Sequence, residues 1–400
     1  MDSIHTSSGK APLKGIVVLE FAHAVMGPAC GLLLADMGAD VIHIEPPEGD
    51  STRRLRGFGT GYFSFYNRNK RSLALDIKSE QGKYIVEQLV QHADVLIENF
   101  GPGTMDRLGY GYEALAAKNP RVIYCSLKGF LSGPYERRHA MDEVVQMMGG
   151  LAYMTGPVGM PLRAGTSVVD ITGGMFGVIG ILAALYEREH TGKGQYIKSA
   201  LFETTAFLMG QHMAYSAITQ EPVPPMPARV SAWSVYRVFE TRDNETVFIG
   251  IISEKHWERF CRAFAREDWL NDPRLATNND RIAQRAWFLP AVEDMIRSMT
   301  KAEVIRRCEE AEIAFAPIAR PEDLFDDVQL NQGGSLLTTT LPDGTVTKLP
   351  TLPLEMDYTR FGLRRNPPQI GEHTREILQE CGLSDKFIAK LSEQGVIGGL

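Results

Sequence analysis

The residue with the most distinctive chemical setting is Asp170, which lies in the segment RAGTSVVDITGG at residues 163–174. The segment passes from a β-branched run into apolar residues with glycine, so a helix is expected to begin close to Asp170. An aspartate at such a junction commonly caps the helix by accepting hydrogen bonds from its first amides. No Ser/His or Cys/His nucleophile pattern occurs elsewhere in the chain, so a role for Asp170 in chemistry stays open beside capping.

The residues that precede Asp170 alternate between strand-like and helical patterns. Strands are expected at 15–21, 41–44, 94–97 and 121–127, and helices at 29–37, 82–92 and 112–118. Such alternation predicts a Rossmann-like parallel sheet, covered by helices on both faces and binding ligands at the carboxyl ends of its strands. Because the turn at residues 23–28 reads HAVMGP and lacks the GxGxxG pattern, dinucleotide binding is disfavoured.

A second lobe is expected after residues 221–227, where four prolines in seven residues exclude a helix interior or a central strand. Two apolar helices, at 173–187 and 201–215, precede this linker. Beyond it come hairpins at 235–251 and 336–349, helices within 256–299 and 301–311, and a helical end at 372–391. We therefore predict a large α/β domain at 1–220, a smaller α+β domain at 221–330, and a segment at 331–400 that returns to the large domain.

The composition excludes several classes of protein. Charged residues make up 23% of the chain and the formal net charge is -7, which argues against a nucleic-acid or anionic-membrane binder. The five cysteines are far apart and lack metal-ligand spacing, so we expect reduced thiols, no metal site and a cytoplasmic protein. The richest apolar stretch, 171–185, is short and broken by glycines, and the first dozen residues lack the apolar core of a secretory signal. No membrane segment is therefore expected.

Short motifs in one order extend over nearly the whole chain. They are VLEF (18–21) with Gly27 and Pro28, GADV (38–41) with IEP (44–46), NRNKRS (67–72), DVLIENFGPG (94–103), KGF (128–130), the Asp170 segment, GKGQ (192–195) and GEHT (371–374). In this combination they resemble the type III CoA-transferases, the CaiB/BaiF family that includes formyl-CoA transferase. The resemblance implies a homodimer whose two chains pass through one another like links.

By this resemblance Asp170 is the nucleophile. Its carboxylate attacks an acyl-CoA thioester to give a mixed anhydride, the CoA thiolate then forms an enzyme thioester, and the acceptor acid takes over the CoA. Coenzyme A is thus a substrate, and neither a metal nor a tightly bound cofactor is needed. The carboxylate must be ionised and shielded from water, because water would hydrolyse the anhydride.

The resemblance also implies which residues contact CoA, whose phosphates need cationic groups and backbone amides. The matching positions are Val25, Met26, Asn69, Lys70, Asn99, Phe100, Gly101, Arg107, Lys128, Arg138 and His139. For Lys70 and its neighbour Arg71, the alternative is a solvated turn before the run at 73–75. Because both flanks match the family motif, Lys70 is expected to be a ligand.

The sequence departs from the family where the acyl group is covered. Formyl-CoA transferases carry a run of glycines near the start of the second lobe, whereas this chain reads MPARVSAWS at 226–234. Oxalate and formate are therefore disfavoured as substrates, and succinyl-CoA with a C4 to C6 dicarboxylate is expected. Arg229 is a candidate for pairing with the free carboxylate of such an acid, although a surface arginine beside a proline linker is the alternative.

Two other functions remain as alternatives. The related α-methylacyl-CoA racemases place a histidine immediately before the aspartate that matches Asp142, and this chain has Met141 there. A thioether cannot shuttle a proton, and the nearest imidazole, His139, is two residues earlier. The second alternative is a non-catalytic acyl-CoA-binding subunit, which the presence of Asp170 disfavours.

Overall fold

The computed structural model describes residues 11–229 and 231–399. The chain divides into two compact units, Met1–Ala228 with Val328–Leu400, and Arg229–Asp327. The domain boundaries expected from the sequence lie at 220/221 and 330/331. Most of the N-terminal dozen residues, for which no secretory signal was expected, lie outside the described residues.

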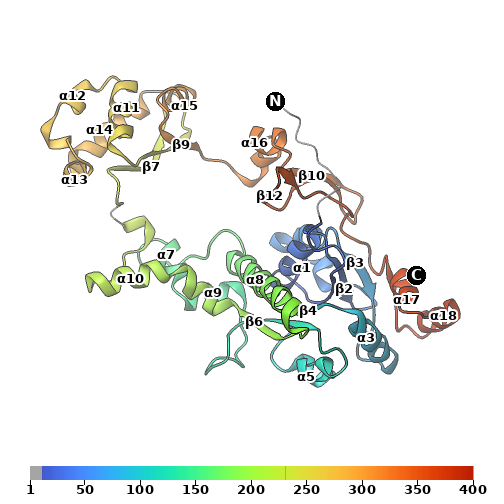
Figure 1. Ribbon diagram of the computed structural model, residues 1–400. Helices are drawn as coiled ribbons and strands as arrows, with labels where there is room; N and C mark the ends of the chain where they lie inside the picture. Colours follow the sequence, from blue (N-terminus) through green and yellow to red (C-terminus); the bar gives the residue numbers. More distant parts are fainter. Residues whose placement is uncertain (1–10, 230, 400) are drawn as a thin grey trace. The chain divides into compact units, whose positions relative to one another are not determined.

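The first unit is built on a parallel sheet of six strands in the order β3-β2-β1-β4-β5-β6 (Figure 1). The strands are β1 (Val17–Phe21), β2 (Asp40–Glu45), β3 (Arg71–Ala74), β4 (Val95–Glu98), β5 (Ile123–Lys128) and β6 (Tyr196–Ala200). The predicted α/β class and parallel sheet are confirmed. The strand order reverses between β1 and β4, which is where open sheets of this kind bind ligands.

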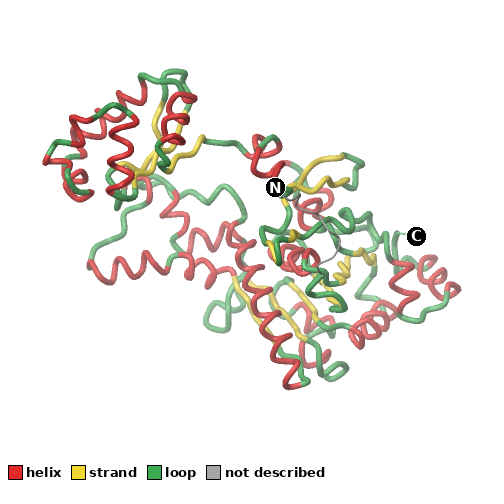
Figure 2. Tube along the Cα trace, turned by 45° about the horizontal axis from the view of Figure 1, so that its top comes forward, coloured by secondary structure: helices red, strands yellow, loops and turns green. Residues whose placement is uncertain are grey.

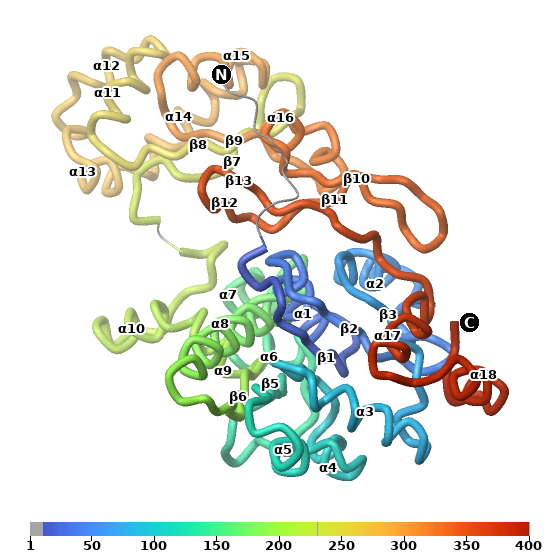
Figure 3. Tube along the Cα trace, turned by 45° about the vertical axis from the view of Figure 1, so that its right-hand side comes forward, coloured from blue at the N-terminus to red at the C-terminus, as the bar shows by residue number. Residues whose placement is uncertain are grey.

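Helices cover both faces of this sheet, as a parallel sheet requires. Helices α1 (Met26–Asp36) and α8 (Val168–Thr191) pack on the face that presents Val18, Val95 and Ile123. The other face packs against α3 (Glu80–His92), α17 (Thr374–Glu380) and α18 (Asp385–Glu393). Figure 3 shows that the end of the chain, drawn in red, lies beside β3. The C-terminal segment packs with the first unit of the structure.

Shorter elements complete the first unit. They are α2 (Tyr62–Tyr66), α4 (Thr104–Leu108), α5 (Tyr112–Ala116), α6 (Asp142–Met148), α7 (Leu151–Thr155), α9 (Leu201–Leu208), α10 (Gly210–Thr219), α16 (Val328–Gln332), β10 (Leu336–Thr340), β11 (Val346–Pro350), β12 (Glu355–Met356) and β13 (Thr359–Arg360). The hairpin predicted at 336–349 is β10 with β11. The single helix predicted at 201–215 is wrong, because the chain forms two helices that divide at Met209 and Gly210.

The second unit is a small α+β domain. Its antiparallel sheet has the order β7-β8-β9 and includes the predicted hairpin. Its elements are β7 (Val235–Glu240), β8 (Thr246–Ile251), α11 (Glu254–Ala263), α12 (Glu267–Leu270), α13 (Asn278–Ala283), α14 (Arg285–Arg297), α15 (Lys301–Glu310) and β9 (Ala314–Pro317). Trp257, Phe260 and Phe288 lie at the centre of its hydrophobic core.

Helix α8 is longer than the sequence patterns predict. Its 24 residues are long and apolar enough, by length and composition alone, to cross a membrane, a criterion that the core helix of a soluble protein also meets. The glycines do not break the helix but let it approach its neighbours closely. A Cβ added at Gly174 would lie 2.8 Å from the carbonyl oxygen of Met26, and one at Gly177 would lie 2.9 Å from Leu127 Cδ2. Figures 1 and 2 show α8 lying along the strands of the sheet.

A buried cluster of charges lies beneath the carboxyl ends of β1 and β2. The ammonium group of Lys70, which is 0% exposed, donates to both carboxylate oxygens of Glu20 at 2.9 and 2.8 Å. It also donates to Pro28 O and to Asn67 Oδ1, each at 3.0 Å. The ring of His43 contacts the same Glu20 through Nδ1 at 2.8 Å. This cluster joins β1, β2 and the segment before β3 through charge rather than apolar packing.

The cluster predicts that Lys70→Ala destabilises the protein strongly. Removal of Lys70 leaves the buried Glu20 carboxylate with His43 as its remaining cationic partner, and breaking a buried pair in this way costs up to about 3–5 kcal/mol. The matched control is Lys83→Ala, because Lys83 pairs with Glu80 at 2.7 Å on an exposed helix surface, where such pairs contribute about 0–1 kcal/mol. Urea unfolding followed by circular dichroism measures both. Equal midpoints for the two variants would contradict a structural role for Lys70.

A second prediction concerns the dependence of stability on pH. Burial alone would lower the pKa of His43, but the neighbouring carboxylates of Asp50 and Glu20 raise it to about 9. A group whose pKa is raised on folding stabilises the protein fully below its unfolded pKa of about 6.5, and this stabilisation is lost as the pH rises through about 9. The free energy of unfolding of the wild type, relative to His43→Gln, should therefore fall between pH 7 and pH 9.5 (approximate limits that bracket this titration). A difference that stays constant over this range would show that His43 does not titrate there.

Candidate active site

Asp170 is the third residue of α8, and it does not cap this helix. The cap position is occupied by Ser167, whose side chain makes no capping hydrogen bond. The backbone amides of Val169 and Asp170 instead donate to Asp142 Oδ2, at 2.9 and 3.3 Å. The capping interpretation of Asp170 is therefore wrong, and the β-branched pair before it forms the first turn of the helix. Its carboxylate is left for another role.

Asp142 holds the start of α8 in place. It is the first residue of α6, is only 5% exposed, and accepts hydrogen bonds at both oxygens. Besides the two amides on Oδ2, Gln146 Nε2 and Arg163 Nη2 donate to Oδ1 at 2.6 and 2.9 Å. Four donors thus satisfy one carboxylate, which is what a buried charge requires.

A cavity of about 560 Å³ opens in front of Asp170. The residues on its wall that the sequence singled out are Val25, Met26, Asn99, Phe100, Gly101, Lys128, Arg138, His139, Asp142 and Asp170. These residues come from α1, from loops that follow strands of the sheet, and from the starts of α6 and α8. The carboxyl ends of parallel strands meet at one edge, so segments far apart in sequence converge there.

Tyr62, Arg163 and Ser167 are among the residues of this wall to which sequence reasoning gave no role. Arg163 and Ser167 belong to the segment in which Asp170 was found. Their position close to Asp170 in the sequence was the signal that could have marked them as site residues. The contact of Arg163 with Asp142 depends on tertiary structure and leaves no trace in residue spacing.

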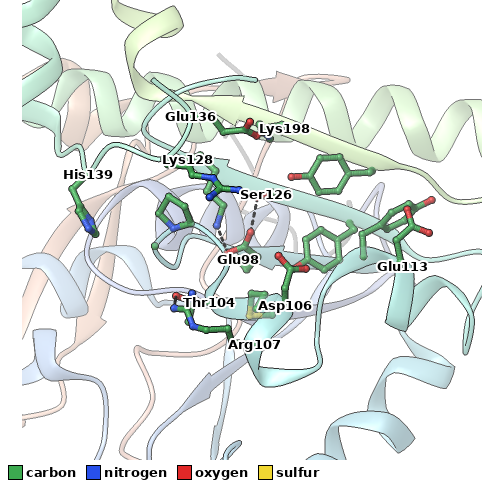
Figure 4. Close-up of a pocket in the computed structure, with 18 residues that line it drawn as sticks. Glu98, Thr104, Asp106, Arg107, Glu113, Ser126, Lys128, Glu136, His139 and Lys198 are labelled. Carbon is green, nitrogen blue, oxygen red and sulfur yellow. Dashed lines mark hydrogen bonds and ion pairs between the residues drawn. The ribbon is translucent and has the colours of Figure 1, made fainter. Parts of the chain in front are cut away.

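A second, larger cavity of about 1050 Å³ adjoins the first (Figure 4). The two share Gly101, Pro102, Lys128 and His139. Arg107 lies on the wall of the larger cavity, where its Nη2 donates to Thr104 Oγ1 at 2.9 Å.

Two pairs of opposite charges lie on this wall, Lys128 with Glu98 and Lys198 with Glu136, and Figure 4 labels all four residues. Lys128 Nζ donates to Glu98 Oε2 and to Phe100 O, each at 2.6 Å, and Lys198 is paired with Glu136. A third cavity of about 670 Å³ has Phe100, Thr104, Pro46, Ile77 and Lys78 on its wall. All three cavities therefore meet around residues 99–104.

Two predicted CoA contacts lie elsewhere. Lys70 is enclosed in the charge cluster with Glu20, so it is neither on the cavity wall nor in a solvated turn. The side chain of Asn69 is also buried, where its Oδ1 accepts the amides of Arg364 and Arg365 at 2.6 and 3.0 Å. Both residues connect parts of the fold in this structure. Arg229 is the first residue of the second unit, whereas Asp170 belongs to the first.

The electrostatic setting of Asp170 favours its neutral form. Burial and the nearby charge of Asp142 raise its pKa to about 7, and Arg163 opposes the rise. Carboxyl groups with a strongly perturbed pKa in a cavity are typical of functional sites. Within residues 11–229 and 231–399, no group of three or more His, Cys, Asp or Glu side chains is arranged to hold a metal ion.

Comparisons with known proteins identify relatives along almost the whole chain. The model of CoA-transferase family III matches residues 13–374. The chain is 34% identical to a succinate–glutarate CoA-transferase of Agrobacterium fabrum, over 93% of this chain and 96% of the relative. It is 33% identical to a formyl-CoA:oxalate CoA-transferase of Streptomyces coelicolor, over 96% and 99%. The beta subunit of a succinyl-CoA–L-malate CoA-transferase of Chloroflexus aurantiacus is 32% identical, over 96% and 98%.

A solved structure gives the same result. The crystal structure of a CaiB/BaiF family protein from Brucella suis matches with a TM-score of 0.82 and 31% identity, over 93% of this chain and 100% of that one. A family model that spans nearly the whole chain, relatives of similar length with transferase activities, and a shared fold all agree. The chain belongs to the family III CoA-transferases, also called type III or CaiB/BaiF transferases.

Proposed function

We propose that this enzyme transfers CoA from an acyl-CoA donor to a carboxylic acid through covalent intermediates on Asp170. The observation that carries the proposal is the position of the Asp170 carboxylate. The carboxylate opens into a cavity and does not cap helix α8. Nine other residues that the family resemblance implicates lie on the wall of the same cavity. A nucleophile must be reachable and yet shielded from water, and a carboxylate in such a cavity meets both conditions.

The reaction would proceed in four displacements. Asp170 attacks the thioester carbonyl, so that a mixed anhydride forms and CoA leaves as the thiolate. The thiolate attacks the aspartyl carbon of the anhydride, which gives an enzyme thioester and releases the donor acid. The acceptor carboxylate then attacks this thioester to form a second mixed anhydride and free the thiolate again. Attack of the thiolate on the acceptor acyl carbon yields the new acyl-CoA and restores Asp170.

The cavities offer a path for CoA from its phosphates to its thiol. Arg107 and Arg138 carry positive charge on the walls, and the glycine-containing segment 99–103 lies between the cavities. Lys128 is occupied by Glu98, so it would position the end of β4 and β5 as much as bind a phosphate. We propose that the thioester end of CoA reaches Asp170 past Val25 and Met26, while its phosphates lie toward Arg107.

For the acids, we propose succinyl-CoA as donor and a C4 to C6 dicarboxylate as acceptor. Two of the relatives carry names with dicarboxylate substrates, succinate–glutarate and succinyl-CoA–L-malate. Relatives named for formyl-CoA and oxalate are about equally similar to this chain, so sequence identity alone does not indicate which acids it uses. The choice rests on residues 226–234, which lack the glycine run of the formyl-CoA transferases.

We also propose a cytoplasmic homodimer. The outer side of α8 and the following helices expose large apolar side chains, among them Ile179, Tyr186, Phe207 and Ile218. Exposed apolar surface of this extent is typical of contact faces between chains. A second copy of this chain is the partner that the family resemblance implies.

A racemase is disfavoured by the residue that precedes Asp142. Met141 is exposed and carries no group that exchanges protons. A non-catalytic subunit would need no free carboxylate in the cavity. Neither alternative predicts covalent modification of Asp170.

The proposal predicts that Asp170→Ala abolishes transfer while the fold and CoA binding persist, since Asp142 and not the Asp170 side chain holds the start of α8. Incubation of the wild type with acyl-CoA, followed by borohydride or hydroxylamine trapping and mass spectrometry, should label Asp170. Asp170→Ala is the better variant, because the amide of Asp170→Asn can deamidate and restore activity. Residual activity above a few per cent (roughly, set against the 10⁴-fold scale of covalent catalysts) would assign the nucleophile elsewhere.

The raised pKa predicts how the rate depends on pH. Because only the ionised carboxylate attacks, kcat/KM should increase as the pH rises through about 7 and level off above it. Asp142→Asn removes a neighbouring negative charge, so the midpoint should move to lower pH. Glu143→Gln is the matched control on the same helix, and its midpoint should stay that of the wild type. A profile that is flat from pH 5.5 to 8.5 in the wild type (approximate limits around the titration) would contradict the assignment.

A further inference from the structure

We propose that Arg163 binds the free carboxylate of a dicarboxylate acyl group and thereby makes the enzyme selective for dicarboxylic acids. This inference rests on the proposed function and names the residue that would set its substrate class. Arg163 lies on the loop between α7 and α8, on the wall of the cavity that contains Asp170.

The guanidinium of Arg163 is anchored at one nitrogen and has donors left over. Nη2 donates to Asp142 Oδ1 at 2.9 Å, which fixes the side chain. Nη1 is 4.0 Å from Glu143 Oε2, which is beyond hydrogen-bonding distance. Nε is buried and has no acceptor among the described residues. The side chain is 25% exposed, so part of the group faces the cavity.

A guanidinium in this state suits a carboxylate ligand. Its planar set of N–H donors matches the two oxygens of a carboxylate. A bound carboxylate would accept hydrogen bonds from the donors of Arg163 that Asp142 does not use. The ion pair with Asp142 holds the plane in position before the ligand arrives. Such preorganisation lowers the entropic cost of binding.

Asp142 also sets the distance between Arg163 and the nucleophile. One of its oxygens holds Arg163, and the other holds the amides of Val169 and Asp170. The cation and the nucleophilic residue are therefore attached to opposite sides of one carboxylate. An acid with a carboxyl group at each end can place one at Asp170 for reaction and the other at Arg163.

The other cations of the cavity are less suited to this role. Lys128 is held by Glu98 and Phe100, and Arg138 packs against the ring of Tyr135 at 4.7 Å. Lys128 also lies on the wall of the larger cavity, which we assign to CoA. The positive charge of Arg163 acts to lower the pKa of Asp170 and so favours the ionised carboxylate. The two ends of the site would thus serve different parts of the substrate.

Since the donor acyl group and the acceptor occupy the same place in turn, Arg163 should matter in both half-reactions. The first can be isolated by mixing the enzyme with succinyl-CoA or butyryl-CoA alone and measuring the enzyme-CoA thioester by mass spectrometry. The variants are Arg163→Ala, Arg163→Lys and Arg163→Gln, of which the last retains a hydrogen-bond donor to Asp142. Arg229→Ala and Arg107→Ala serve as comparisons, the first for the other dicarboxylate candidate and the second for the CoA phosphates.

We expect Arg163→Ala to lower the ratio of thioester formation from succinyl-CoA to that from butyryl-CoA by about 10- to 100-fold, the effect of losing a charged hydrogen bond. Arg163→Lys should recover part of the ratio, because an ammonium keeps the charge without the planar fork. Steady-state selectivity for succinate over butyrate as acceptor should change in parallel. Arg107→Ala should weaken binding of both acyl-CoA substrates and leave their ratio unchanged.

Three results would overturn the inference. An equal loss with both acyl-CoA substrates in all Arg163 variants would mean that Arg163 only positions Asp142. A ratio that changes in Arg229→Ala but not in Arg163→Ala would move the role to the second unit. A wild type that prefers butyryl-CoA would remove the dicarboxylate preference itself. Failure of the wild type to form any thioester would instead overturn the proposed transfer reaction, so the two failures are distinguishable.

Discussion

The carboxylate of Asp142 is the contact on which the geometry of the site depends. It accepts the first amides of α8 at one oxygen and Arg163 with Gln146 at the other. Without it, the positive end of a 24-residue helix would have no capping partner, because Ser167 does not supply one. The same charge raises the pKa of Asp170. Asp142 thus fixes where Asp170, the proposed nucleophile, lies, and together with burial it makes Asp170 harder to ionise.

The negative charge of Asp142 has two opposing effects on the Asp170 carboxylate. A neighbouring negative charge makes the Asp170 carboxylate harder to ionise but more basic when ionised, and basicity favours attack on a thioester. Arg163 moderates the effect, since it stands close enough to stabilise the charged form. Burial, Asp142 and Arg163 together therefore set the fraction of Asp170 that is ionised at neutral pH. Because Asp142 and Arg163 form an ion pair, a change at either residue also alters the effect of the other on the pKa of Asp170.

The parts of the structure that the sequence predicts well are those with local signals. Alternating patterns identified β1, β2, β4 and β5, and motif order pointed to Asp170 and to the loops that surround its cavity. The patterns did not identify β3, of which they marked only the run at 73–75, and they missed β6, whose residues Tyr196–Ala200 follow a turn and directly precede a helix. The patterns also could not show whether a side chain is enclosed within the fold or lies on the cavity wall. Lys70 is enclosed in a cluster with Glu20, which lies fifty positions earlier on β1, and no spacing rule reports that contact. Arg163 escaped notice for the same reason.

The second unit is inserted into the first, since the chain leaves at Ala228 and returns at Val328. The returning segment is bound firmly: Asn69 N donates to Arg365 O at 2.9 Å, His373 N to Ser72 O at 3.1 Å, and α17 packs beside β3. Both ends of the insert are thus fastened to one folded body. Protease nicking within the proline-rich linker would therefore not release the insert, which stays attached through its other end. The double attachment also restricts any motion of the insert to paths that both tethers permit, a stronger limit than a single hinge imposes.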